Sequence, residues 1–237
     1  MRIVRALMLG LLVAVVGCGG NGGDEAGPTP STSGTTSTTT AAPCGAEGVQ
    51  AVTLTTRDGA ELDAALVGEG EIGVVLGHQF RSDFCSWVPF AQQLAQRHIG
   101  ALAVNFVSTS LDGDMVAGAR ELLRRGAKRI ILVGASMGGT AALVAATNMD
   151  VAGVAAVSAP REFSDLDALP AVRQLEIPAL FLAGRRDGEF ARDARRLYRA
   201  TNSRVKALVL TAGAEHGTDL LQDPKARRAL LAFLARG

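Results

Sequence analysis

The sequence predicts an α/β protein with a doubly wound, mostly parallel sheet and helices on both of its faces. Short, almost wholly apolar runs alternate along the chain with segments of helical character. Such runs are typical of parallel strands that are buried on both faces. Right-handed crossovers between the strands place the loops at their carboxyl ends along one edge of the sheet, and we expect the functional residues there.

The elements follow from hydropathy and turn residues. Two alternating runs, the first from Val49 and the second over 60–66, flank an Arg-Asp-Gly turn at 57–59 and predict a β-hairpin at an antiparallel edge. Further strands are expected at 71–76, 101–107, 129–133, 151–157, 179–182 and 205–210. Helices are expected at 87–97, 116–125, 137–147, 166–173, 189–200 and 218–235. The connection between Ser158 and Ile177 is too short for a large cap domain.

Composition excludes several classes of function. Of the 237 residues, 48% are hydrophobic and 20% are charged, and the formal net charge of +1 argues against nucleic acid as a partner. The sequence has no Cys-x-x-Cys or paired-His array for a metal and no glycine-rich motif for a nucleotide. We therefore expect no cofactor and no metal.

The N-terminus has the features of an export signal. Arg2 and Arg5 precede an apolar run over 6–16 that is too short to span a bilayer, which is typical of a secretory signal peptide. The run ends in Val-Val-Gly-Cys18, which resembles the lipobox of bacterial lipoproteins. This resemblance implies that residues 1–17 are removed and that Cys18 is lipidated. The alternative is an ordinary signal peptide with an incidental cysteine.

Residues 18–43 are expected to form a disordered linker. From Asn21 onward the segment contains Gly, Ser, Thr, Pro, Ala and acidic residues and no large apolar side chain, so it cannot bury enough surface to fold. With a lipid on Cys18, it would tether an exported domain, residues 44–237, to the outer side of a membrane. Without the lipid, the same segment is an untethered leader.

Two cysteines remain in the domain. Cys44 and Cys85 form an even pair, and in an oxidising compartment this favours a disulfide. The bridge would hold the start of the domain to the loop after the third strand. Buried free thiols are the alternative.

The strongest chemical motif lies at the end of the strand over 129–133. Gly134-Ala-Ser136-Met-Gly138 follows it, and a helix rich in small residues comes next. In a nucleophile elbow the serine occupies a strained strand-to-helix turn, so glycines two positions to either side must relieve crowding. We therefore expect Ser136 to be a nucleophile. A serine at a tight turn without chemistry is the alternative.

These motifs give the domain a resemblance to the α/β-hydrolase superfamily along nearly its whole length. The nucleophile elbow is followed by candidate acid and histidine residues in the superfamily's chain order. The domain is similar to the compact members without a large cap, such as dienelactone-hydrolase-like enzymes and small esterases. The resemblance implies the α/β-hydrolase fold and a serine hydrolase.

The base and the acid can also be argued from their positions. His216 follows the last strand in a loop of small residues, so its ring could lean over the sheet toward Ser136 and act as the base. Asp187 follows the strand over 179–182 and would orient that histidine. The alternatives are a surface histidine in a loop and a helix-capping or arginine-paired aspartate.

Two backbone amides are expected to stabilise an oxyanion. One belongs to Met137, and the other to Phe80 in the loop after the third strand, with Gln79 as the second choice. Members of the superfamily usually have a glycine after the histidine of this loop, and here Gln79 follows His78. His78 itself is expected to be a structural, hydrogen-bonding residue.

The sequence therefore predicts hydrolysis of a carboxylic ester through an acyl-enzyme on Ser136. The thin connection after Ser158 favours an open cleft and a small or medium acyl substrate. Cleavage of a lactone, thioester or peptide is an alternative, because fold and triad do not choose among these. A catalytically silent lipoprotein that binds a ligand with the same fold is another.

Overall fold

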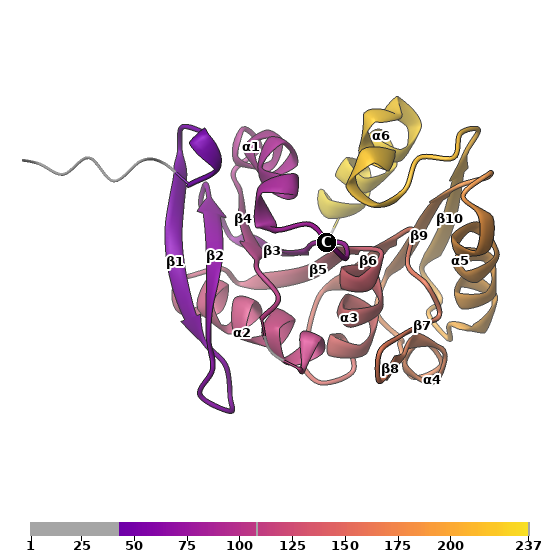
Figure 1. Ribbon diagram of the computed structural model, residues 1–237, viewed down its shortest axis with the longest axis horizontal. Helices are drawn as coiled ribbons and strands as arrows, with labels where there is room; N and C mark the ends of the chain where they lie inside the picture. The colour runs from indigo at the N-terminus through magenta and orange to yellow at the C-terminus, as the bar shows by residue number, and fades with distance from the viewer. Residues whose placement is uncertain (1–42, 108, 237) are drawn as a thin grey trace, which may run out of the picture. The chain divides into compact units, whose positions relative to one another are not determined.

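The structure of the chain is a computed structural model that describes residues 43–107 and 109–236 (Figure 1). The expected signal peptide, Cys18 and nearly all of the linker lie outside these residues. No helix in the described part has the length and apolar character needed to cross a membrane.

An eight-stranded sheet forms the centre of the domain (Figure 1). Its order is β1 (Val49–Thr55), β2 (Glu61–Val67), β4 (Ile99–Val104), β3 (Ile72–Gly77), β5 (Arg129–Ala135), β6 (Gly153–Val157), β9 (Ala179–Gly184) and β10 (Lys206–Thr211). β1 and β2 form the predicted hairpin, and β2 also pairs antiparallel with β4. The pairs from β4 to β10 are all parallel, as predicted.

Helices cover both faces of this sheet (Figure 1). One core cluster packs α1 (Val88–Ala95) and α6 (Pro224–Leu234) on one face. The other packs α2 (Leu111–Arg124), α3 (Met137–Ala145), α4 (Ala168–Val172) and α5 (Gly188–Ala200) on the opposite face. The side chains of β5 explain why both faces are covered. Ile130 and Leu132 pack in the cluster with α2 to α5, and Ile131 and Val133 pack in the cluster with α1 and α6. Successive side chains of a strand point to opposite faces, so a wholly apolar strand requires two covers.

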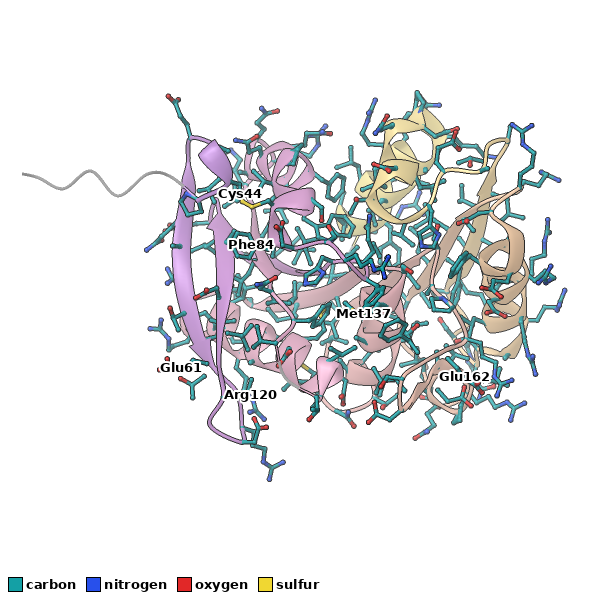
Figure 2. All side chains as sticks on the ribbon, in the orientation of Figure 1. Cys44, Glu61, Phe84, Arg120, Met137 and Glu162 are labelled. Atoms are coloured by element: carbon teal, nitrogen blue, oxygen red, sulfur yellow. A yellow bond between two sulfur atoms is a disulfide. The ribbon has the colours of Figure 1, made fainter. Side chains whose placement is uncertain are left out.

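A disulfide fixes the start of the domain. Cys44, in the 3-10 turn η1 (Pro43–Gly45), is bonded to Cys85 in η2 (Phe84–Trp87), as predicted; Figure 2 shows the bond beside the Cys44 label. Two residues after Cys85, Trp87 is fully buried, and its Nε1 donates a 2.9 Å hydrogen bond to the carbonyl of Gly77. The loop that follows β3 is therefore fixed at its far end.

The largest differences from the predicted elements have local causes. β4 ends at Val104 instead of 107, because the Phe106 amide donates to His78 Nε2 and not to a neighbouring strand. α2 begins at Leu111 instead of 116, and its first turn carries Asp112 and Asp114, which favour a helix N-terminus.

Two further differences lie in the second half of the chain. The segment expected as the helix 218–235 consists of η3 (Gly217–Gln222) and α6, which are separated at Asp223. Asp223 is extended, as a residue before proline prefers, and its carboxylate caps α6. The predicted helix 166–173 is shorter, because a small hairpin of β7 (Glu162–Phe163) and β8 (Leu166–Asp167) precedes α4. Strands of two residues are too short to show a periodicity in the sequence.

Candidate active site

Ser136 lies at a strained turn between β5 and α3. Its φ and ψ are 49° and −117°, a conformation that non-glycine residues rarely adopt. Side chains at Gly134 or Gly138 would collide with the backbone of Gly138 or Gly77, respectively. The Ser136 amide donates a 2.8 Å hydrogen bond to Val157 of β6, which holds the turn against the sheet. The two glycines are therefore needed for the close approach of strand and helix.

His216 and Asp187 meet at the same edge of the sheet. Asp187 follows β9 and His216 follows β10, and His216 Nδ1 lies 3.0 Å and 3.2 Å from the two carboxylate oxygens of Asp187. The aspartate side chain is 9% exposed and that of His216 is 34% exposed. A carboxylate can only accept a hydrogen bond, so the proton of a neutral ring resides on Nδ1. The lone pair of Nε2 is then available as a base.

The predicted nucleophile and base share one cavity. Ser136 and His216 both line a space of about 380 Å³. The other lining residues are Gln79, Phe80, Pro160, Glu162, Phe163, Glu189 and Phe190. The ring of Phe190 packs on His216 with centroids 4.1 Å apart. Asp187 thus contacts the histidine at Nδ1, and Ser136 lines the same cavity as His216.

The two predicted oxyanion donors come from adjacent segments. Met137 is the first residue of α3, which begins near the centre of the sheet (Figure 2), and Phe80 lies in the loop after β3. The amide of Gly138 donates a 3.2 Å hydrogen bond to the carbonyl of His78, which joins this loop to the start of α3. Neither the Met137 amide nor the Phe80 amide donates a hydrogen bond within the described residues. Both are therefore available to a ligand, as is the amide of Gln79.

His78 has a different environment from His216. The residue is 4% exposed; its Nε2 accepts a 3.1 Å hydrogen bond from the Phe106 amide, and its Nδ1 lies 2.8 Å from the carbonyl of Gln79. Burial lowers the pKa of His78 below the usual imidazole value, so the neutral ring is favoured. Both ring nitrogens are used by the backbone, which leaves this histidine a structural role. His98, the third histidine, is exposed after α1.

Sequence reasoning missed several residues that line the cavity. Phe163 and Phe190 are aromatic lining residues, and Gln79, which the sequence offered only as the second choice of oxyanion donor, also lines the cavity. Phe163 belongs to the short hairpin that was not predicted, so no signal placed it there. Gln79 did have a signal, because it replaces the glycine expected after His78. No cluster of His, Cys, Asp and Glu among residues 43–107 and 109–236 could hold a metal ion.

The chain is similar in structure to several hydrolases. No protein-family model and no curated protein matches its sequence. An esterase of Pyrococcus furiosus superposes with a TM-score of 0.68 at 19% identity, covering 79% of this chain and 92% of that one. An esterase of Exiguobacterium antarcticum gives 0.64 at 12% identity, covering 78% and 100%. A dienelactone hydrolase of Anabaena variabilis gives 0.62 at 19% identity, covering 78% and 94%.

These likenesses agree with the strand order and the elbow described above. The mostly parallel sheet, the helices on both faces and the sharp turn at Ser136 are shared features of one architecture. Between β6 and β9 the chain contains only the β7–β8 hairpin and the short helix α4. The described part of the chain therefore has the α/β-hydrolase fold, in its compact form without a large cap domain.

Proposed function

We propose that the protein is a serine hydrolase that cleaves carboxylic esters with a small or medium acyl group. One observation carries the proposal: Ser136 and the exposed edge of His216 line a single cavity, while Asp187 holds the other side of the imidazole. The three residues come from loops after β5, β9 and β10. The names of the structural neighbours, esterases from several organisms and a dienelactone hydrolase, agree with this function.

The proposed reaction has two halves that use the same groups. Ser136 Oγ attacks the ester carbonyl carbon and gives its proton to His216 Nε2, while the amides of Met137 and Phe80 stabilise the oxyanion. The tetrahedral intermediate then expels the alcohol, which takes the proton from His216. Water then attacks the acyl-serine and loses a proton to the same nitrogen. Collapse of the second tetrahedral intermediate breaks the bond to Ser136 Oγ, which takes that proton from His216, and the carboxylic acid is released. Asp187 fixes the ring and stabilises its charged form.

Labelling by a fluorophosphonate tests the nucleophile. The wild-type protein should be labelled once, and Ser136→Ala should lose both the label and, by several powers of ten, the turnover of para-nitrophenyl butanoate. Ser158→Ala is a matched control, because Ser158 is a buried serine with a positive φ at the end of the neighbouring strand β6. An unlabelled wild-type protein, or a labelled Ser136→Ala variant, would refute the proposal.

A series of para-nitrophenyl esters tests the size of the acyl group. The cavity is modest in volume, and no large cap covers it in the described residues. We expect kcat/KM to be highest for acyl chains of few carbons. A strong preference for chains beyond about twelve carbons would contradict an open cleft of this volume. Lactones belong in the same assay, because one structural neighbour is a dienelactone hydrolase.

We also propose that the protein is exported and anchored by a lipid on Cys18. The support is the sequence pattern of residues 1–18 together with the Cys44–Cys85 disulfide, since such bonds persist in oxidising compartments. In a bacterial host, radiolabelled palmitate should be incorporated into the wild-type chain and not into Cys18→Ala. Equal incorporation into both would refute the anchor and leave the proposed catalytic site unaffected.

A further inference from the structure

The side chain of Gln79 links two loops of the site. Its Oε1 accepts hydrogen bonds from the amide (3.0 Å) and the hydroxyl (3.1 Å) of Thr218, 139 residues later in the chain. Gly217 permits this approach, because a Cβ at its position would lie 2.6 Å from Gln79 Oε1. Gln79 therefore connects the loop that carries the Phe80 amide to the loop that carries His216.

These bonds fix the orientation of the side-chain amide of Gln79. A backbone N–H can only donate, so the atom next to the Thr218 amide must be the oxygen of Gln79 and not its nitrogen. Nε2, the other end of the side-chain amide, forms no hydrogen bond within the described part of the chain. Gln79 is half-buried and lines the cavity together with Ser136 and His216. Gln79 thus offers an NH2 donor that is unpaired among the described residues, on a side chain of a residue that lines the cavity.

The position of this donor indicates which part of an ester it would meet. The anchor of Gln79 lies two residues after His216, the group that protonates the leaving alcohol in the proposed reaction. The two charged side chains of the cavity, Glu162 and Glu189, are carboxylates and can only accept hydrogen bonds when ionised. The side-chain amide of Gln79 is therefore a neutral donor among the residues that line the cavity, and its anchor in the His216 loop favours the leaving-group side.

We propose that Gln79 Nε2 binds an acceptor oxygen in the alcohol part of the substrate. The preferred substrates are then esters whose alcohol carries an ether, carbonyl or hydroxyl oxygen close to the scissile bond. This inference rests on the proposed function, because it assumes that Ser136 cleaves an ester. It goes beyond that function by assigning a specificity-determining residue and the chemistry that this residue selects.

Two esters of equal size test the proposal. 2-Methoxyethyl butanoate and butyl butanoate differ in one position, where an ether oxygen replaces a methylene group. Each kcat/KM is divided by the rate of hydroxide hydrolysis of the same ester, which removes the difference in intrinsic reactivity. The wild-type protein should then prefer the methoxyethyl ester by about three- to tenfold, the usual worth of one neutral hydrogen bond.

Substitutions of Gln79 separate its two roles. Gln79→Glu keeps an acceptor for Thr218 and replaces the NH2 donor by an oxygen, so the preference should fall to one or below. Gln79→Met removes both the donor and the anchor and should also abolish the preference. Gln174→Glu, the same substitution at an exposed position, should retain it. A ratio is independent of the fraction of folded protein, so partial unfolding cannot imitate this result.

Each other outcome has one meaning. A normalised wild-type ratio of one or less, or an equal loss for both esters in Gln79→Glu, would overturn the role of Nε2. Thr218→Val removes the hydroxyl and keeps the backbone donor, so most of the preference for the methoxyethyl ester should remain. Complete loss of that preference in Thr218→Val would show that the anchor, and not Nε2, determines it, and would overturn the role of Nε2. Failure of the proposed function is recognised separately, because neither ester would then be hydrolysed and fluorophosphonate would not label Ser136.

Discussion

His78 and His216 both follow strands at the same edge of the sheet, yet their surroundings differ. His78 follows β3 and is almost completely buried, with one ring nitrogen bound by the amide of Phe106 and the other by the carbonyl of Gln79. His216 follows β10; one ring nitrogen contacts the Asp187 carboxylate, and its ring lines the cavity with Ser136. A base needs a nitrogen that is free to exchange a proton, and of these two histidines it is His216 that lines the cavity with Ser136.

The comparison shows that two histidines at one edge of the sheet have different roles: His78 is structural, and His216 is the proposed base. The His78 ring joins the loops after β3 and β4, and the Gly138 amide binds its carbonyl. His78 therefore holds the segment that bears the Phe80 amide against the start of α3. His216 lies in a loop whose anchor is the side chain of Gln79, the residue next to His78. The structural histidine and the proposed base are thus linked through a single neighbouring residue.

Removal of each imidazole should give the largest contrast between the two regions. His216→Ala is expected to lower kcat for para-nitrophenyl butanoate by about 10³-fold or more, because the general base is lost. His78→Gln should instead act mainly on stability, lowering the free energy of unfolding by about 1–3 kcal/mol through imperfect replacement of two buried hydrogen bonds. Steady-state kinetics and urea unfolding of both variants measure this. Equal losses of kcat in His216→Ala and His78→Gln would contradict the assignment of different roles to the two histidines.

Asp187→Asn tests the partner of the imidazole that we propose as the base. An asparagine side chain can donate to Nδ1 and so favour the wrong tautomer, and we expect kcat to fall by about 10²–10⁴-fold with little change in KM. Glu189→Gln is the matched control, since this exposed carboxylate also lines the cavity but has no hydrogen bond to His216 among the described residues. A larger loss of kcat in Glu189→Gln than in Asp187→Asn would assign the role of the acid to Glu189.

The Cys44–Cys85 disulfide lies at the end of the loop that carries His78, and its expected role is in stability. The double variant Cys44→Ala/Cys85→Ala opens a loop with a sequence separation of 41 residues, and should lower the free energy of unfolding by roughly 4 kcal/mol on the chain-entropy model. Urea unfolding at neutral pH measures the loss. The kinetic constants of the folded fraction should change much less, because neither cysteine lines the cavity. Unchanged stability would show that the bridge does not constrain the unfolded chain.

Acidification should reveal the smallest effect. Burial lowers the pKa of His78 in the folded protein, whereas in the unfolded chain the ring takes up a proton near its ordinary value of 6.5. The unfolded state then binds more protons, so stability is lost as the pH falls below about 6.5 and down toward the folded pKa, by at most about 1.4 kcal/mol per pH unit. Urea unfolding between pH 7.5 and 5.5 should show a shallower slope for His78→Gln. Equal slopes of the unfolding free energy against pH in the wild type and in His78→Gln would refute a lowered pKa of His78 in the folded protein.

The regular elements could be predicted because their signals are local. The parallel strands β3, β4, β5, β6, β9 and β10 are apolar enough to identify by composition, and the glycines around Ser136 marked the elbow. Element ends were less predictable: β4 ends early because His78, 28 residues before Phe106, takes the amide that would otherwise continue the strand. The β7–β8 hairpin gave no signal, since two residues cannot establish a period.

From the sequence alone we could predict the order of the strands along the chain, the elbow at Ser136, the candidate residues Asp187 and His216, and a disulfide between Cys44 and Cys85. These follow from local steric demands and from the small number of residues with suitable chemistry. The contacts of Phe190 with His216 and of Gln79 with Thr218 became visible with the three-dimensional fold. Such contacts join loops far apart in the chain, and their geometry depends on how the strands are placed side by side, which no local pattern encodes.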